Sequence, residues 1–149
     1  MCSSFKAEIL KGSHALGTQS ANTVRTVVTV DVVKAALYLA SATIGAATTG
    51  YSVTGEVTGT GYTAGGVAVT NATAPAVSGT GAIWTPSASI TYSGVTLSTA
   101  FDSVLLYNDS STGKLGISVH TFGSQTVTAG TFTLVMPANA TGTALIQIV

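Results

Sequence analysis

Charged side chains are scarce in this chain, and their scarcity excludes several classes of protein. Only 7% of the 149 residues are Asp, Glu, Lys or Arg, whereas ordinary soluble domains carry about a quarter. Five basic residues balance five acidic ones, so there is no basic stripe of the kind that binds nucleic acid through phosphates. We therefore expect that the chain does not bind nucleic acid. Because so few charges provide little repulsion between copies, we also expect that it works inside an assembly.

Cysteine and long apolar runs are also few. The single cysteine excludes an intrachain disulfide. The longest apolar stretch, Val32–Leu39, is interrupted by Lys34 and is far shorter than the ~20 residues of a membrane span. Lys6, Glu8 and Lys11 stand where a secretory signal would have an apolar core. We therefore expect no membrane association and folding in a reducing cytoplasm.

The residues that carry most enzyme chemistry are few and scattered. A serine nucleophile needs a base, and the only histidines are His14 and His120. Glycosidases need two converging carboxylates, but Glu56, Asp102 and Asp109 lie far apart in the sequence. A zinc site needs three or four Cys, His or acidic ligands. The sequence therefore predicts no enzyme activity, no cofactor and no metal, with a structural or solvated role for His120.

One glycine-rich segment, VTGEVTGTGYTAGGVAVTN, spans Val53–Asn71 and resembles a nucleotide-binding loop. Its Gly59–Ala64 portion fits a loose GxGxxA pattern, which binds dinucleotides only between a strand and a helix. Here a β-type run follows, so no helix N-terminus is expected to hold a pyrophosphate. There is also no lysine between Lys34 and Lys114 for a phosphate-binding loop. We interpret the segment as an extended connection in which several glycines adopt positive φ.

Alternation of apolar and polar residues recurs along most of the chain and predicts β-strands. Pro86 and Pro137 are expected at strand boundaries, with a kink at Gly94 and a change of phase near Val32–Val33. Turn residues predict a hairpin loop at Asn108–Gly113 and a second turn at Thr128–Gly130. The expected strands are Val27–Val33, Val33–Leu39, Val67–Thr70, Ile90–Leu97, Ser103–Tyr107, Leu115–Phe122, Thr131–Met136 and Leu145–Val149.

These patterns predict an all-β fold, namely an antiparallel β-sandwich of about eight strands that is jelly-roll-like. The segment Ser3–Lys11 alone has a helical pattern, with Phe5, Ile9 and Leu10 as a small apolar face. We expect residues 1–26 to form an N-terminal helix and arm, and residues 27–149 to form a single β-sandwich domain.

Aromatic residues leave one question open. Carbohydrate-binding β-sandwiches present exposed Trp or Tyr rings, and Trp84, Tyr51, Tyr62, Tyr92 and Tyr107 are candidates. Tyr92 shares its phase with Ile90 and is expected in the core. Trp84 fits a core position, an interface anchor or a glycan platform equally well.

Several segments together resemble small virion proteins of tailed bacteriophages. They are SSFKAEILKGSH, VVKAALYLASATIGAATTGYS, TGEVTGTGYTAGGVAVTN, FDSVLLYND and GTFTLVMPANATGTALIQIV. The chain closely resembles capsid decoration (cement) proteins, which are typically jelly-roll-like β-domains that form homotrimers on the capsid surface. This resemblance implies a structural protein of the phage head surface, made in the host bacterial cytoplasm, with the major capsid protein as partner and no catalytic residues. The region Gly17–Val30 is longer than this family suggests.

Two functions follow as hypotheses: capsid decoration, and a tail- or fibre-associated glycan-binding module for host recognition. For the first, we expect the terminal segments to lie at contacts with neighbouring subunits or the shell, because a short helix needs a docking surface and an uncharged edge strand lacks protection. The C-terminal strand fits equally well as part of its own protomer's sandwich. The candidate contact residues are Phe5, Ile9, Leu10, Leu145, Ile146 and Ile148.

Overall fold

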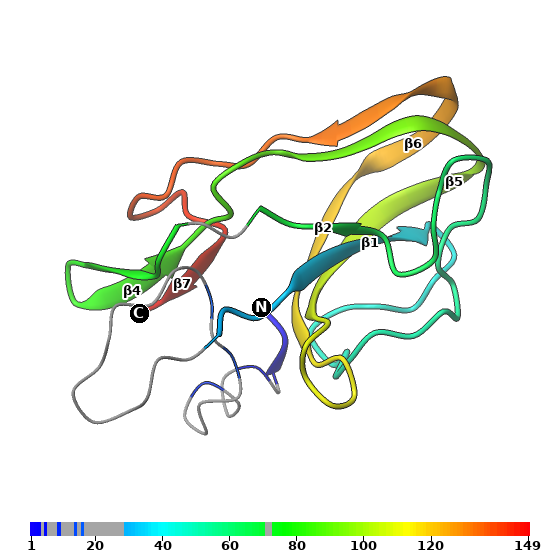
Figure 1. Cartoon of the computed structure of the whole chain (residues 1–149). Coiled ribbons are helices and arrows are strands. Elements are labelled where there is room, and N and C mark those ends of the chain that lie inside the picture. The colour runs from blue at the N-terminus through cyan, green and yellow to red at the C-terminus, as the bar shows by residue number, and fades with distance from the viewer. Residues whose placement is uncertain (4, 6–8, 10–13, 15, 17–28, 71–72) are drawn as a thin grey trace.

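A computed structural model describes residues 1–3, 5, 9, 14, 16, 29–70 and 73–149. The chain is nearly all β, with two antiparallel sheets, as expected for an all-β sandwich. The larger sheet has the strand order β2-β1-β5-β6 and the smaller one β3-β4-β7 (Figure 1). The strands are β1 (Val33–Leu39), β2 (Val67–Ala68), β3 (Ala76–Ser78), β4 (Gly81–Trp84), β5 (Ile90–Asn108), β6 (Gly116–Leu134) and β7 (Ile146–Ile148).

A long hairpin of β5 and β6 dominates the larger sheet. Each strand has 19 residues, and the loop between them lies where Asn108–Gly113 predicted it. The expected strands Ile90–Leu97 and Ser103–Tyr107 are both parts of β5, while Leu115–Phe122 and Thr131–Met136 overlap the two ends of β6. The described residues therefore form seven strands rather than about eight.

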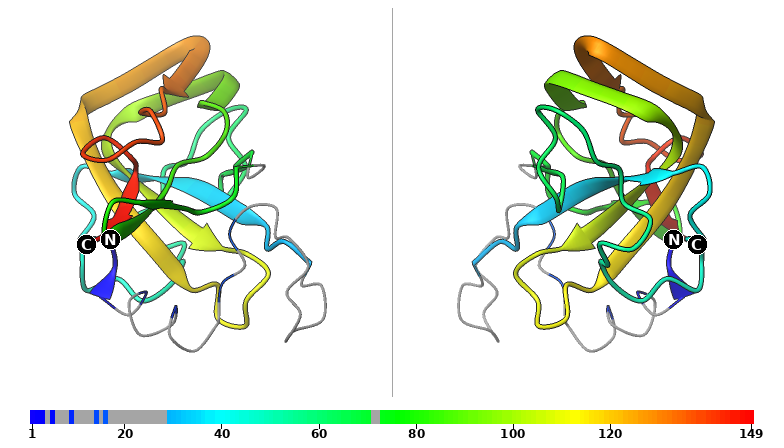
Figure 2. Two further views of the ribbon diagram at one scale, coloured as in Figure 1. Left: turned by 90° about the vertical axis from the view of Figure 1, so that its left-hand side faces the viewer. Right: turned by 90° about the vertical axis from the view of Figure 1, so that its right-hand side faces the viewer.

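The turn predicted at Thr128–Gly130 is wrong. These residues lie inside β6, where Ala129 has a φ of 45° and the register with β5 shifts between Leu97 and Val95. Turn-forming residues also build β-bulges, which bend a strand without ending it. The predicted kink at Gly94 is confirmed, since its φ is 63° and the register shifts beside it. Figure 2 shows the resulting bend of the hairpin.

Strand β1 is buried on both faces. Val33, Ala35 and Leu37 point into the main core, whereas Ala36 and Tyr38 pack in a second cluster on the other side of the sheet. The change of phase expected near Val32–Val33 coincides with the start of this strand. The strand expected at Val27–Val33 is not observed over residues 29–32, and residues 27 and 28 lie outside the described part of the chain.

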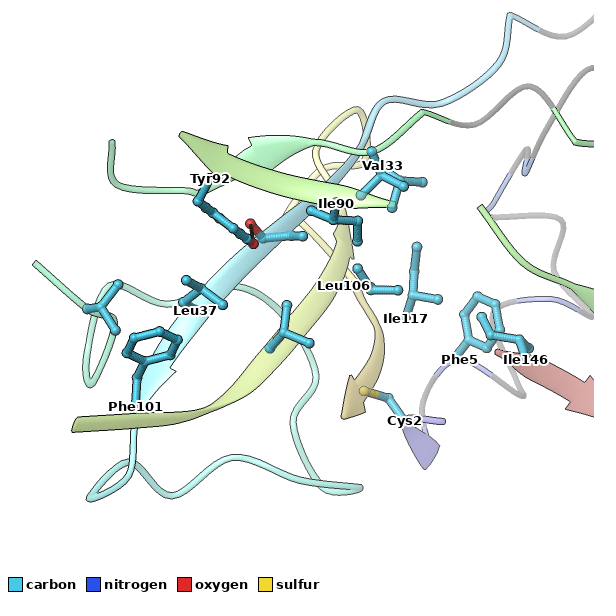
Figure 3. Packing of buried hydrophobic residues seen from close by; sticks show 14 of the residues in the cluster. Cys2, Phe5, Val33, Leu37, Ile90, Tyr92, Phe101, Leu106, Ile117 and Ile146 are labelled. Carbon is cyan, nitrogen blue, oxygen red and sulfur yellow. Dashed lines mark hydrogen bonds between the residues drawn. The ribbon is translucent and has the colours of Figure 1, made fainter. Parts of the chain in front are cut away.

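The smaller sheet packs against the same core as the larger sheet. Trp84 of β4 pairs with Ile146 of β7, and both side chains are buried. Figure 3 shows Ile146 beside Phe5, with Ile117 and Leu106 of the larger sheet next to them. The main core thus joins both sheets and the N-terminal segment.

The first residues of the chain attach to the larger sheet. The backbone N–H of Cys2 donates to the carbonyl oxygen of Ile117 (3.0 Å), and that of Ser3 donates to Ala46 (2.9 Å). Ser3, Phe5 and Ile9 have helical backbone, but most of Ser3–Lys11 lies outside the described residues. The N-terminal helix and the arm over residues 1–26 therefore stay predictions, as does the jelly-roll topology.

Candidate functional site

The terminal segments meet at one apolar hollow of about 250 Å³. Phe5 and Ile9 line it from the N-terminal side, and Ile146 and Ile148 line it from β7, with Trp84 among the other lining residues. Phe5 is fully buried and Ile146 is 4% exposed, whereas Ile148 is 41% exposed. The structure therefore brings four of the six candidate contact residues together within one protomer.

The other two candidates are placed differently. Leu145 is half-buried and lines a second hollow, next to β6. Leu10 lies outside the described residues. Since β7 pairs with β4 of the same chain, the C-terminal strand does contribute to its own protomer's sheet, while the outer side of Ile148 stays accessible.

The buried carboxylate of Glu56 organises the glycine-rich segment. The sequence analysis did not predict this role. Glu56 is only 6% exposed. Its carboxylate accepts hydrogen bonds from the hydroxyl of Tyr51 (2.6 Å), the hydroxyl of Tyr62 (2.8 Å) and the backbone N–H of Gly65 (2.7 Å). Buried carboxylates need such partners, because an unpaired buried charge is costly. Glu56 therefore ties the segment to itself and to the neighbouring loop.

All five tyrosines of the chain gather around this carboxylate, and we call them, with Glu56, the tyrosine–glutamate cluster. Tyr92 donates to the carbonyl oxygen of Ala35 (2.8 Å) and Tyr107 to that of Gly65 (2.8 Å). Tyr62 also accepts a hydrogen bond from the backbone N–H of Leu37 (3.0 Å). The cluster thus joins the glycine-rich segment to β1 and β5.

Burial raises the pKa of every one of these tyrosines above its ordinary value. For Tyr51 and Tyr62, the hydrogen bond to Glu56 raises the pKa further, because an ionised phenol could no longer donate to a carboxylate. The hydroxyls therefore remain neutral hydrogen-bond donors. Their arrangement fixes the loop in place.

Two glycines explain why the segment is so rich in this residue. Gly66 has a φ of 68°, and a Cβ atom there would overlap the carbonyl oxygen of Ala35. Gly61 has a φ of 77°, and a Cβ atom there would overlap the carbonyl oxygen of Gly94. The segment thus needs glycine for close backbone approach as well as for positive φ, which supports its interpretation as an extended connection.

An ionic cluster lies beside the hairpin loop and contacts the tyrosines. Asp109 pairs with Lys34 (3.0 Å) and Lys114 (2.9 Å). The hydrogen bond from Lys114 is the largest of the effects that hold the pKa of Asp109 below its usual value. Lys114 also lies over the ring of Tyr51 (5.4 Å to its centroid), which stacks on Tyr107 at 4.7 Å. Through Asp109, the ion pairs connect Lys34 of β1 to Lys114 of the hairpin loop.

His120 lies half-buried at the second hollow. Its Nε2 is 2.9 Å from Oγ of Ser118, which is itself fully buried. Burial lowers the pKa of His120, and the positive N-terminus lowers it further. Because Ser118 is fully buried and offers no surface to a substrate, this pair suits packing better than nucleophilic attack.

The aromatic candidates for a glycan platform are not exposed. Trp84 is 2% exposed and donates through Nε1 to the carbonyl oxygen of Thr73 (2.9 Å), so its place is the core. Tyr92, as expected, is buried, and so is Tyr107, whereas Tyr51 and Tyr62 are half-buried within the cluster.

Comparison of the chain with protein-family models, curated proteins and solved structures finds no match. Within the described part of the chain, no three His, Cys, Asp or Glu residues lie together as metal ligands would. No helix among these residues is long and apolar enough to cross a bilayer.

Proposed function

We propose that this chain is a capsid decoration protein that forms homotrimers on the outer surface of a phage head and stabilises the shell. The observation that carries the proposal is a set of exposed apolar side chains in two long stretches of the β-sandwich that contain no charged residue. Val77 is 85% exposed, Val135 79% and Ile148 41%. Residues 57–101 and 115–149, which contain them, hold no Asp, Glu, Lys or Arg. Depletion of charged residues is typical of the buried centre of protein interfaces.

The tyrosine–glutamate cluster supports the same function in a second way. The segment with the most specific resemblance, EVTGTGYTAGG, begins at Glu56 and ends at Gly66. Hydrogen bonds between Glu56 and Tyr51, Tyr62 and Gly65 hold it in place. A rigid β-domain of this kind stabilises a shell by binding only its assembled form, which is mass action rather than catalysis.

The proposal is tested with purified virions and with shells that lack the protein. Quantitative mass spectrometry should find copies on the order of the number of shell subunits. Added protein should bind the expanded shell and raise its melting temperature. A few copies per particle, located at the tail, would instead support the host-recognition alternative and contradict decoration.

A further inference from the structure

A hollow of about 530 Å³ lies beside the end of β1, in the chain that follows this strand, and we call it the hydroxyl hollow. Its volume is within the range of about 300–1,000 Å³ that is usual for ligand pockets. The residues that line it are Tyr38, Ser41–Ile44, Ala47–Gly50, Ser52, Thr54 and Gly55. The hollow is therefore large enough for a small molecule.

Hydrogen bonds fix the walls of the hydroxyl hollow to the larger sheet. The backbone N–H of Gly116 in β6 donates to the carbonyl oxygen of Thr49 (2.8 Å). The hydroxyl of Tyr38 in β1 donates to the carbonyl oxygen of Ser52 (2.5 Å). Both walls are thus held in place before any ligand arrives. A preformed site spares a ligand the cost of ordering the chain around it.

Hydroxyl groups dominate the polar lining of the hollow. Within the described part of the chain, four of them belong to exposed side chains and form no hydrogen bond to another residue, namely those of Ser41, Thr43, Thr49 and Thr54. Each hydroxyl can both donate and accept a hydrogen bond. The hollow therefore offers accessible groups that suit a ligand with donors and acceptors of its own.

The rest of the lining is apolar and uncharged. Ala42, Ile44 and Ala47 provide aliphatic surface between the hydroxyls. No Asp, Glu, Lys, Arg or His is among the described residues that line the hollow. The nearest acid in the sequence, Glu56, directs its carboxylate to its three partners in the tyrosine–glutamate cluster instead.

This lining selects against other classes of ligand. A phosphate or an ammonium group would find no counter-ion in the hollow, and tight binding of such groups uses charged partners. A purely apolar molecule would cover the hydroxyls without pairing them, which is costly. A neutral saccharide has both features that the lining matches: hydroxyl groups on its edge and C–H groups on its ring faces.

We propose that the hydroxyl hollow binds a small neutral saccharide. The hydroxyls of Thr43 and Thr49 pair with those of the sugar, and Ile44 contacts its C–H groups. This site differs from a glycan platform of exposed aromatic rings, because hydroxyl groups rather than rings make the contacts. The proposal goes beyond capsid decoration and does not rest on it.

The first test measures binding to the full chain. The probes are maltose, cellobiose, lactose and N,N′-diacetylchitobiose, screened by saturation-transfer NMR and then titrated by calorimetry. At least one should bind with a stoichiometry of one per chain and a dissociation constant in the millimolar range or below. Glucose 6-phosphate and glucosamine should bind no more tightly than glucose. Tighter binding of either charged sugar, or no binding of any neutral probe at about 10 mM, would overturn the proposal.

The second test locates the site with substitutions of exposed residues. Thr43→Val and Thr49→Val remove one hydroxyl each and keep the shape, so each should weaken binding of the probe about two- to tenfold. Ala47→Trp should abolish binding by filling the hollow. Thr58→Val is the control, because Thr58 is exposed and does not line the hollow. Circular dichroism checks folding, and unchanged binding in all three hollow variants would show that the proposed site is wrong.

Two further measurements identify the source of the sugar and separate this site from decoration. Binding to the free disaccharides supports a free sugar as the source, whereas binding only to an array of immobilised glycans with the same terminal sugars supports the end of a polysaccharide. Ala47→Trp should still bind shells as the wild type does. If this variant loses shell binding and the wild type binds no sugar, the hollow contacts the shell and the saccharide site is wrong. If sugar binds but shells do not, the site stands and decoration is wrong.

Discussion

Replacing Glu56 with alanine is the most direct test of how the glycine-rich segment is held. The substitution removes the acceptor of three hydrogen bonds, from Tyr51, Tyr62 and Gly65. The N–H of Gly65 and the hydroxyl of Tyr62 would then be buried donors without an acceptor, each costing about 1–3 kcal/mol. Tyr51 is half-buried and can turn toward water at little cost.

The expected loss in free energy of unfolding is therefore about 3–5 kcal/mol, since neighbouring bonds are not fully additive. For a chain of this size, that corresponds to a fall in melting temperature of about 6–20 °C. Glu56→Gln keeps one acceptor oxygen and a similar shape, so it should lose less, about 1–2 kcal/mol. Urea unfolding followed through Trp84 fluorescence, at one protein concentration, measures both values.

Thr58→Ala is the matched control, because Thr58 is exposed and two residues away. It should change stability by no more than about 0.5 kcal/mol. If Glu56→Ala unfolds together with this control, the tyrosine–glutamate cluster does not stabilise the fold and the reasoning is refuted.

Two further changes test other parts of the structure. Gly66→Ala should prevent folding or destabilise the protein strongly, because the new Cβ would overlap the Ala35 carbonyl. Gly79 also has a positive φ but has open space around it, so Gly79→Ala should lower the free energy of unfolding by only about 1 kcal/mol, as measured by thermal unfolding. His120 has a lowered pKa in the folded state, so the unfolded state binds more protons and stability should fall as pH drops below about 6.5. His120→Gln should flatten that decline between pH 7 and pH 5 in urea titrations, and an unchanged slope would show that His120 does not cause it.

Local signals predicted much of the larger sheet correctly. The hairpin loop after Asn108 and the kink at Gly94 depend on residues whose backbone preferences act within a few positions. Pro86 and Pro137 lie outside strands, as their missing N–H groups require. Tyr92 was placed in the core by its phase alone. Such features need no knowledge of distant contacts.

Features that depend on long-range register were not predictable in this way. Thr128–Gly130 has the composition of a turn, but pairing with β5 makes it a bulge within β6. The hairpin of β3 and β4 was missed, because strands of three and four residues show too little alternation to be recognised. From the sequence, Trp84 fits a core position, an interface anchor or a glycan platform equally well. The pairing of β4 with β7 is what places it in the core.

The tyrosine–glutamate cluster was missed for a related reason. Its tyrosines come from positions 38 to 107, and they converge on Glu56 only when the glycine-rich segment lies against β1 and β5. One signal was available in the sequence: Glu56 is the only charged residue between Lys34 and Asp102. A lone carboxylate in so long an uncharged stretch suggests a specific role for its charge.

The use of tyrosine as the partner of Glu56 bears on how residues 35–101 can contain no other charged side chain. A buried carboxylate is usually paired with Lys or Arg, but here neutral hydroxyls and one backbone N–H satisfy it. Burial keeps these phenols protonated, so their hydrogen bonds do not depend on a counter-ion. The ionic cluster of Lys34, Asp109 and Lys114 is confined to the hairpin end of the sheet. The rest of β6 and the whole of the smaller sheet contain no Asp, Glu, Lys or Arg.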